Sequence, residues 1–308
     1  MAVYTKITEG ELCSLLELYG LSGLAACEGA SEGIENTTYF VTLNNGSKYV
    51  LTIFEGADKS SLPFYAKLTR VLSEAGLPVP APIVDRHGQM LQRLHEKPAL
   101  LFPRAKGSHR TRASIVDCAA IGAMLARIHL TLLEQKTDLK APNPRGLDWF
   151  ESVMKDLSER VDEASRALFT RLLSVRSRLD AMTLPVGLIH GDLFLDNTLF
   201  FEGRLSAVID FYNAGEDILL LDLAIVANDW CCDALGELDR QKVSALKAAY
   251  ATERNLSAQE NQAWAMLLAW AAGRFWLSRL KSQLDNEAHQ KDPGQYRKIL
   301  ERRLQACL

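Results

Sequence analysis

Three side chains with hard oxygen atoms are spaced so that they could move a phosphoryl group. Asp192 follows His190 and Gly191 at the end of an apolar run, and Asn197 comes after four intervening residues. Asp210 follows a second apolar run. A carboxylate at Asp192 could accept the proton of a substrate hydroxyl group, while Asn197 and Asp210 could bind a Mg²⁺ ion that bridges nucleotide phosphates. The spacing therefore predicts an ATP-dependent phosphotransferase.

A short hairpin must bring these groups together. The residues from Thr198 to Phe201 and from Leu205 to Ile209 alternate like strands, and Glu202-Gly203 between them is a tight-turn sequence. A hairpin here would fold Asp210 back beside Asn197, as one shared metal ion requires. An ordinary polar turn is the alternative, but the position of the pattern between two apolar runs favours the catalytic interpretation.

At this motif the sequence resembles the aminoglycoside phosphotransferase/choline kinase family, and within that family the homoserine kinases. The motif alone is typical of phosphoryl transfer. The segments that look like homoserine kinases come later: Asp222-Leu223-Ala224, Asn228-Asp229-Trp230 and Phe275 to Leu280. The resemblance covers nearly the whole chain. It implies transfer of the γ-phosphoryl group of ATP to the hydroxyl group of L-homoserine, with ATP and Mg²⁺ as cofactors.

The resemblance also implies the architecture, an α+β, two-lobed, protein-kinase-like fold. We expect a nucleotide-binding N-lobe with an antiparallel sheet in residues 1–104. A mostly helical C-lobe in residues 105–308 should hold the catalytic loop, the metal hairpin and the substrate. Asp222 and His190 are expected to support the catalytic loop without touching the reacting groups.

Size and composition suit this architecture and exclude other classes of protein. The 308 residues suffice for two domains, and 48% apolar and 24% charged residues are typical of soluble globular proteins. A net charge of -3 disfavours nucleic acid as a partner. The six cysteines lack metal-ligand spacing, and the longest apolar run, Ala263 to Ala272, is too short to cross a membrane. Without a recognisable signal peptide, we expect a cytoplasmic protein with reduced thiols and no membrane partner; the oligomeric state is left open.

The first hundred residues carry the signals of helices and a β-hairpin. A helix is expected over Thr8–Tyr19, with its first residue as N-cap, and a second over Leu62–Ser73. Strands are expected over Thr38–Leu43 and Lys48–Phe54, because these runs are rich in β-branched and aromatic residues. The sequence Asn44–Ser47 between the strands predicts a tight turn.

Two segments of the N-lobe are candidate nucleotide contacts. In the family, a loop equivalent to the glycine-containing residues 28–36 covers the phosphates, so Ser31 and Asn36 are candidate phosphate donors. The resemblance to kinases also implies that the backbone around Leu100 and Phe102 faces the adenine, in a hinge strand between the lobes. An ordinary turn and a plain edge strand are the alternatives.

One position departs from the general kinase pattern. Thr52 stands where the strand should carry a phosphate-binding lysine, and the following helix offers no glutamate before Glu74. Both members of the Lys–Glu ion pair are therefore missing together. Loss of one partner alone would leave an unpaired charge in the cleft. The loss of both therefore indicates a variant of the kinase pattern and not a damaged site.

The C-lobe shows helical periodicity. A helix is expected to begin near Arg112, and His129 within it is expected to form structural hydrogen bonds. Further helices are expected in the ranges 149–180 (two helices), 219–230, 239–252, 258–284 and 293–307.

The acceptor site is predicted after Asp210. Homoserine has an ammonium and a carboxylate group, so we assign Asp229 to the ammonium, Arg274 to the carboxylate and Trp230 to the same site. A structural salt bridge of Arg274 with Asp217 or Asp222 is the alternative.

Three other functions are kept as alternatives. Choline or ethanolamine kinase is the first, because Trp230, Trp270 and Trp276 could form an aromatic cage around a quaternary ammonium. An aminoglycoside-type acceptor is disfavoured by the basic C-terminal segment. A pseudokinase-like nucleotide-binding module would explain the missing lysine, but the intact Asp192, Asn197 and Asp210 oppose it.

Overall fold

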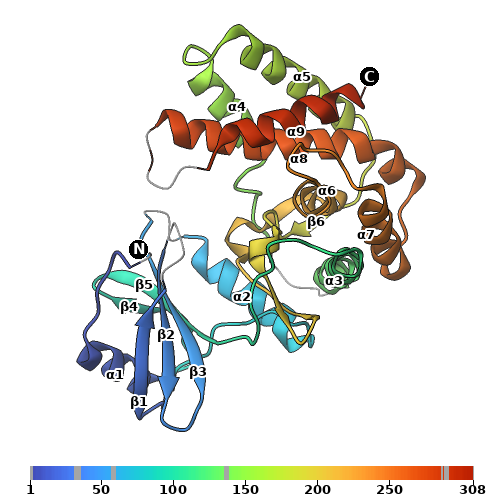
Figure 1. Ribbon diagram of the computed structural model, residues 1–308. Helices are drawn as coiled ribbons and strands as arrows, with labels where there is room; N and C mark the ends of the chain where they lie inside the picture. The colour runs from blue at the N-terminus through green and yellow to red at the C-terminus, as the bar shows by residue number, and fades with distance from the viewer. Residues whose placement is uncertain are drawn as a thin grey trace. The chain divides into compact units, whose positions relative to one another are not determined.

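The chain divides into two compact units (Figure 1). Residues 1–107 and 206–212 form the first unit, and residues 108–205 and 213–308 form the second. The structure, a computed structural model, describes residues 3–30, 36–56, 60–134, 139–285, 287 and 291–307. The division into a nucleotide-binding N-lobe, residues 1–104, and a catalytic C-lobe, residues 105–308, stays a prediction.

A single antiparallel sheet dominates the described part of the first unit. Its strands lie in the order β1 (Leu24–Gly29), β2 (Asn36–Leu43), β3 (Lys48–Phe54), β5 (Lys97–Pro103) and β4 (Gln92–Leu94). The β2–β3 connection turns at the predicted sequence, where Gly46 has a φ of 84° that glycine adopts without steric cost. The predicted strands and turn are confirmed.

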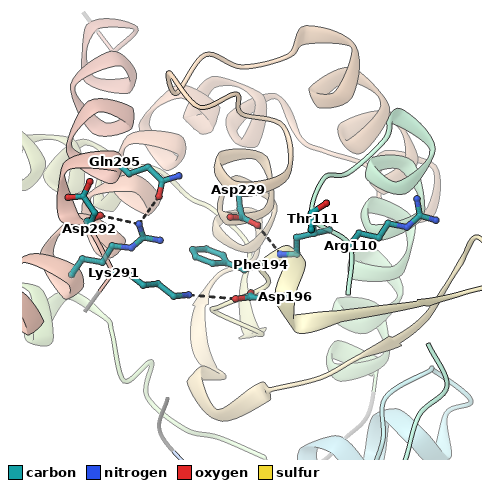
Figure 2. A pocket seen from close by; sticks show the side chains of 10 residues that line it. Arg110, Thr111, Phe194, Asp196, Asp229, Lys291, Asp292 and Gln295 are labelled. Carbon is teal, nitrogen blue, oxygen red and sulfur yellow. Dashed lines mark hydrogen bonds and ion pairs between the residues drawn. The ribbon is translucent and has the colours of Figure 1, made fainter. Parts of the chain in front are cut away.

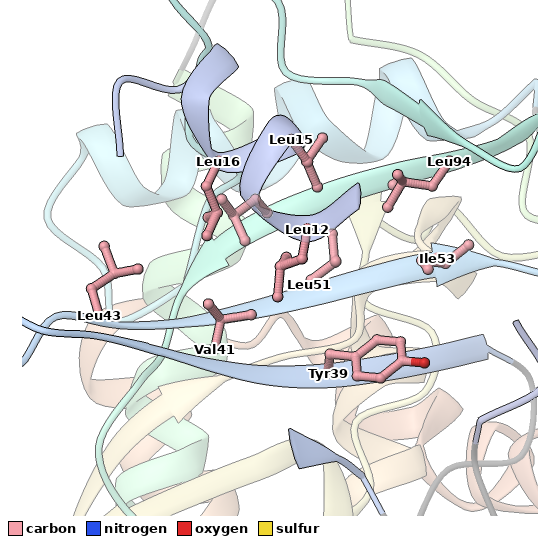
Figure 3. Packing of buried hydrophobic residues seen from close by; sticks show 11 residues of the cluster. Leu12, Leu15, Leu16, Tyr39, Val41, Leu43, Leu51, Ile53 and Leu94 are labelled. Atoms are coloured by element: carbon pink, nitrogen blue, oxygen red, sulfur yellow. The ribbon is translucent and has the colours of Figure 1, made fainter. Parts of the chain in front are cut away.

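Helix α1 (Glu9–Leu18) covers one face of this sheet (Figure 3). Thr8 caps the helix in a capping box with Glu11, as the sequence predicted for its N-cap. Leucines of α1 pack onto alternate residues of the strands, and the cluster includes Leu12, Leu15, Leu16, Val41, Leu51 and Ile53. Burial of each large apolar side chain stabilises the fold by about 1.5–3 kcal/mol.

Residues 206–212 pack with the first unit although they are distant from it in sequence. The backbone N–H of Val208 donates to the carbonyl oxygen of Pro78 at 2.9 Å, and Ser206 Oγ donates to the carbonyl oxygen of Lys106 at 2.6 Å. The ring of Tyr212 lies against Tyr65 of α2 (Leu62–Glu74), with centroids 4.2 Å apart. A boundary drawn along the sequence cannot anticipate a segment that returns to an earlier unit.

The second unit is mostly helical. Its helices are α3 (Ile115–Glu134), α4 (Leu147–Leu157), α5 (Glu163–Asp180), α6 (Leu219–Trp230), α7 (Arg240–Glu253), α8 (Ala258–Leu284) and α9 (Pro293–Gln305). The antiparallel pair β6 (Val186–Ile189) and β9 (Gly215–Ile218) lies among them. The strands β7 (Thr198–Phe201) and β8 (Arg204–Val208) form the predicted hairpin, with Glu202 and Gly203 both at positive φ.

Close helix packing positions the elements around the catalytic segment. Helix α8 runs beside α6 and α9 (Figure 1). Helix α3 packs against α7, and a Cβ at Gly122 would lie 2.3 Å from the carbonyl oxygen of Leu246. Only glycine therefore allows this approach of the two helices. By length and composition alone α3 could also cross a membrane, a test that buried core helices pass as well.

The α+β fold with an antiparallel N-terminal sheet and a helical C-terminal part is confirmed. The six cysteines, all within the described ranges, are free thiols, as predicted.

Candidate active site

A sharp turn after β6 leads to the predicted catalytic base. Gly191 has a φ of 77°, and a Cβ there would lie 2.6 Å from the carbonyl oxygen of Asn213. The turn therefore requires glycine. The half-buried Asp192 follows, and its backbone N–H donates to Nδ1 of His190 at 3.2 Å. The chain then enters the short helix η1 (Leu195–Asn197).

The buried carboxylate of Asp222 holds the backbone of this loop. It accepts hydrogen bonds from the N–H groups of His190 at 2.6 Å and Gly191 at 2.7 Å. Its Oδ2 also contacts Nε2 of His129 at 3.1 Å, and Nδ1 of His129 contacts the hydroxyl of Tyr250 at 2.9 Å. Side chains of α3, α6 and α7 thus meet beneath the loop.

The environment keeps Asp222 ionised. Burial alone would raise the pKa of this carboxyl, but the hydrogen bond and charge of His129, the charge of His190 and the hydrogen bond from the N–H of Gly191 bring the pKa below its ordinary value. A carboxyl with a depressed folded-state pKa contributes stability above its unfolded pKa of about 3.9, and that stability is lost as the pH falls through the folded-state value. Support of the loop is therefore complete at neutral pH.

The two predicted metal ligands lie in different units. Asn197 is 9% exposed, and its amide nitrogen donates to the carbonyl oxygen of Asp192 at 2.7 Å, which leaves the amide oxygen for a metal ion. Asp210 is half-buried in the first unit, with a φ of 66°. Among residues with a side chain, Asp and Asn adopt this left-handed conformation most readily. That Asn197 and Asp210 bind one ion stays a prediction.

Arg274 presents an unpaired donor beside the catalytic loop. It is 2% exposed, and among the described residues its Nη1 has no hydrogen-bond partner. A Cβ at Gly191 would lie 3.4 Å from this nitrogen. Burial lowers the pKa of Arg274 to about 10, so the guanidinium remains a cation at neutral pH. The alternative salt bridges do not form within the described chain, because Asp217 accepts from Asn143 at 2.6 Å and Asp222 binds the loop.

A pocket of about 480 Å³ lies beside η1 (Figure 2). Charged side chains of both signs line it: Arg110, Asp196, Asp229, Arg279, Lys291 and Asp292. Lys291 lies 3.6 Å from Asp196, and Nη1 of Arg279 donates to Oε1 of Gln295 at 2.9 Å. A small ligand with both an ammonium and a carboxylate group would find partners for both.

Asp229 is the most buried acid of this pocket. Burial raises its pKa to about 6, although the N–H of Leu195 donates to its Oδ2 at 2.8 Å. The carboxylate is therefore mostly ionised at neutral pH and becomes neutral in mild acid. Its position on α6 fixes it next to the start of η1, as Figure 2 shows.

The sequence matches the model described as "Phosphotransferase enzyme family" over residues 26–256. The chain belongs to this family. Relatives named homoserine kinase include one from Polaromonas naphthalenivorans (strain CJ2), 39% identical over 99% of this chain and 98% of that protein. Another, from Pseudomonas aeruginosa (strain UCBPP-PA14), is 41% identical over 91% of this chain and 88% of that protein.

Solved structures of this phosphotransferase type share the fold. The amicoumacin kinase hAmiN, in complex with AMP-PNP, Ca²⁺ and Ami, has a TM-score of 0.75 at 16% identity and covers 97% of this chain and 92% of that one. A choline/ethanolamine kinase family protein from Mesorhizobium loti has a TM-score of 0.68 at 16% identity, with 97% and 92% covered. At such identities the likeness concerns the fold alone.

The predicted nucleotide contacts of this phosphotransferase remain predictions. Ser31 lies outside the described residues. Asn36 begins β2, where its side-chain oxygen accepts from the N–H of Glu55 at 3.3 Å. Leu100 and Phe102 lie on β5 with buried side chains, so any contact with adenine would come from the backbone, as predicted for the hinge.

The assignment of Trp230 to the acceptor site stays a prediction, and the structure places its indole in the interior. The indole is 2% exposed, and its N–H donates to the carbonyl oxygen of Leu193 at 3.3 Å. Trp230 therefore supports the catalytic loop from the interior. The sequence alone did not show whether Trp230 or its neighbour Asp229 faces the interior of the protein.

Arg279 and Lys291 line the pocket but were not predicted as site residues. Arg279 belongs to the Phe275–Leu280 segment that carries the resemblance, so its charge within an apolar segment was an available signal. Lys291 lies just before α9, and its sequence neighbours gave no signal.

We expect Asp222→Ala to destabilise the protein and to slow the reaction. The substitution leaves the N–H groups of His190 and Gly191 without their acceptor, and each buried unsatisfied donor costs about 1–3 kcal/mol. Urea unfolding and steady-state rates measure the two effects. Asp180→Ala, which removes an exposed acid at the end of α5, is the control and should change stability by no more than about 0.5 kcal/mol. Wild-type unfolding of Asp222→Ala would refute the supporting role.

Proposed function

We propose that this protein is a homoserine kinase, which transfers the γ-phosphoryl group of ATP to the hydroxyl group of L-homoserine and yields O-phospho-L-homoserine. The observation that carries the proposal is the 37–41% identity to relatives named homoserine kinase, over nearly the full chain. The proposed compartment is the cytoplasm.

The residues of the loop suit the role of a positioned base. Asp192 would orient the acceptor hydroxyl group and take its proton as the new P–O bond forms, since the proton leaves late in a largely dissociative transfer. Asp222 fixes the backbone on the N-terminal side of Asp192. The amide of Asn197 fixes the carbonyl oxygen of Asp192 itself. The carboxylate thus starts from a restrained backbone, which reduces the entropy lost on reaching the reactive geometry.

Asn197 and Asp210 are the proposed ligands of Mg²⁺. Their amide and carboxylate oxygens are the hard donors that this ion prefers. Among the described residues no group of three or more His, Cys, Asp or Glu side chains could hold a metal ion. Two protein ligands supplemented by phosphate oxygens and water fit that finding. When bound, the ion would neutralise charge on the phosphates.

The pocket and Arg274 suit an amino-acid acceptor. Asp229, ionised above about pH 6, would bind the ammonium group. Arg274 would bind the carboxylate through its unpaired Nη1. Nη1 of Arg274 lies beside Gly191, the residue before Asp192, so a carboxylate bound there would bring the acceptor close to the proposed base.

Burial of the tryptophans disfavours choline as the acceptor. Trp230, Trp270 and Trp276 are each at most 2% exposed, so they cannot form a cage open to a quaternary ammonium. A carboxylate-binding arginine would also be left without a partner by choline, which has no carboxylate.

Purified protein with Mg-ATP and a panel of homoserine, choline, ethanolamine and kanamycin tests the proposal. We expect coupled ADP release with homoserine alone, and a phosphorylated product by mass spectrometry. Preference for another acceptor would replace homoserine in the proposal. Nucleotide binding without turnover of any acceptor would instead support the binding-module alternative.

We expect Asp192→Asn to separate chemistry from nucleotide binding. Loss of a positioned acid–base group lowers turnover by about 10²–10⁴-fold. Mg-ADP affinity, measured by calorimetry, should stay close to that of the wild type, because Asp192 is not a proposed metal ligand. A parallel loss of Mg-ADP binding would assign Asp192 to the metal site.

The raised pKa of Asp229 predicts that kcat/KM for the acceptor depends on pH in mild acid. Because the ionised form binds the ammonium group, kcat/KM for homoserine should fall below about pH 6 as Asp229 gains a proton. Asp229→Asn should remove this limb and lower kcat/KM by about 10- to 100-fold, the scale of a lost charge-assisted hydrogen bond. The apparent affinity for Mg-ATP over the same pH range is the control. If the limb persists in Asp229→Asn, another group titrates.

A further inference from the structure

Several charged side chains of the pocket beside η1 already bind other parts of the protein. Nη1 of Arg110 lies 3.0 Å from Oδ2 of the buried Asp117, and Lys291 lies 3.6 Å from Asp196. Asp292 caps α9, because its Oδ1 accepts from a backbone N–H of the first helical turn at 2.8 Å. These charges therefore have partners or structural roles without a ligand.

Arg279 and Asp229 are the two remaining charged residues of the pocket. Within the described part of the chain, neither forms an ion pair with the other or with a third residue. Asp229 uses Oδ2 to accept from the N–H of Leu195 at 2.8 Å, which leaves Oδ1 for a ligand. Opposite charges that line one pocket without pairing suit a ligand that carries both complementary charges.

The guanidinium of Arg279 is held in a fixed orientation. Its Cζ lies 4.4 Å from the centroid of the Tyr296 ring, and Nη1 donates to Oε1 of Gln295 at 2.9 Å and to the carbonyl oxygen of Asp292 at 3.3 Å. Dashed lines mark the contacts at Gln295 and Asp292 in Figure 2. Tyr296 is 1% exposed, and its ring is nearly parallel to that of Phe194, with centroids 6.0 Å apart. A cation on such a buried ring loses little freedom when a ligand binds.

These contacts leave one edge of the guanidinium without a partner. An arginine has five N–H donors, of which Nη1 holds two, and both serve the contacts with α9. Nε and Nη2 of Arg279 have no hydrogen-bond partner in the described ranges, and they form the side edge of the planar group. Tyr296 covers one face of that group, so the free edge can reach a ligand in the pocket. Such an edge binds a carboxylate through two parallel hydrogen bonds.

We propose that Arg279 is a specificity-determining residue, which binds the carboxylate of the acceptor while Asp229 binds its ammonium group, and which thereby restricts the acceptor to α-amino acids with a side-chain hydroxyl. This inference rests on the proposed phosphotransferase function. Arg274 is not a lining residue of the pocket and would reach the same carboxylate from the side of Gly191. The two oxygens of a carboxylate have enough acceptor capacity for two guanidinium groups.

Arg279→Gln tests the proposal with two matched acceptors, L-homoserine and 3-amino-1-propanol, which is homoserine without its carboxylate. We expect kcat/KM for L-homoserine to fall by about 10- to 100-fold, the scale of a lost charge-assisted hydrogen bond. The loss should appear mainly in KM, because the carboxylate is bound equally in the ground state and the transition state. The kcat/KM for 3-amino-1-propanol should stay close to that of the wild type. The ratio of the two values does not depend on how much of the variant is folded.

Two further variants serve as controls. Arg297→Gln removes an arginine of α9 that pairs with Glu301 at 3.0 Å outside the pocket, and it should leave the acceptor ratio unchanged. Arg279→Lys keeps the positive charge but not the edge with two donors, so it should recover only part of the preference for L-homoserine.

Binding without phosphoryl transfer gives a second measurement. L-2-aminobutyrate has the ammonium and carboxylate groups of homoserine but no hydroxyl, and 1-propylamine is its counterpart without the carboxylate. Calorimetric titration of the nucleotide-free protein should show that Arg279→Gln weakens binding of L-2-aminobutyrate by about 10- to 100-fold. Binding of 1-propylamine should not weaken.

An unchanged acceptor ratio in Arg279→Gln, with or without a fall in activity, would overturn the proposal. Wild-type protein that binds L-2-aminobutyrate no more tightly than 1-propylamine would overturn it as well. These outcomes are distinct from failure of the proposed function. A wild-type protein that phosphorylates none of the acceptors would refute the homoserine kinase assignment, whereas the titrations would still report whether Arg279 binds a carboxylate.

Discussion

The catalytic loop depends on the buried carboxylate of Asp222. Two backbone N–H groups that precede Asp192 would otherwise be buried without these acceptors. Asp222 is in the first turn of α6, where the helix dipole favours a negative charge. Its contact with His129 extends the support to α3. Packing of the helices, including the close approach at Gly122, therefore helps to fix the backbone before Asp192, the proposed base.

Asp222, which holds the loop, differs from Arg274 and Asp229, the proposed ligand-binding residues, in how many of its polar atoms have hydrogen-bond partners within the protein. Asp222 has partners on both oxygens, and its pKa is depressed. Arg274 keeps an unpaired buried nitrogen, and Asp229 has a raised pKa despite one backbone donor. An unsatisfied buried group costs stability, and the proposed binding of a substrate carboxylate by Arg274 would offset that cost. Residues that hold the loop are satisfied by the protein itself.

Most elements of the fold could be predicted from local signals in the sequence. The capping box at Thr8, the turn before Ser47 and the helical periodicity of the second unit each act over a few residues, and all reappear in the structure. The β7–β8 hairpin also followed from the sequence, whereas the roles of Asp192, Asn197 and Asp210 stay predictions. The sequence could not show that Trp230 faces inward or that residues 206–212 join the first unit, because both depend on contacts between distant segments. Arg279 and Lys291 were missed for the same reason, since only the folded chain gathers them with Asp229.

The joint absence of the lysine and the glutamate also affects how the charge of the phosphates can be neutralised. A buried Lys–Glu pair links a strand to a helix at the expense of removing two charges from water, and it remains sensitive to the loss of either member. Thr52 carries no charge, and no glutamate precedes Glu74 in the helix that follows, so this position avoids that cost. A lysine, however, would also contact the phosphates, and no tyrosine or threonine supplies that cation. If Asp210 binds the metal ion as proposed, that ion would neutralise a larger share of the phosphate charge here than in a kinase that retains the lysine.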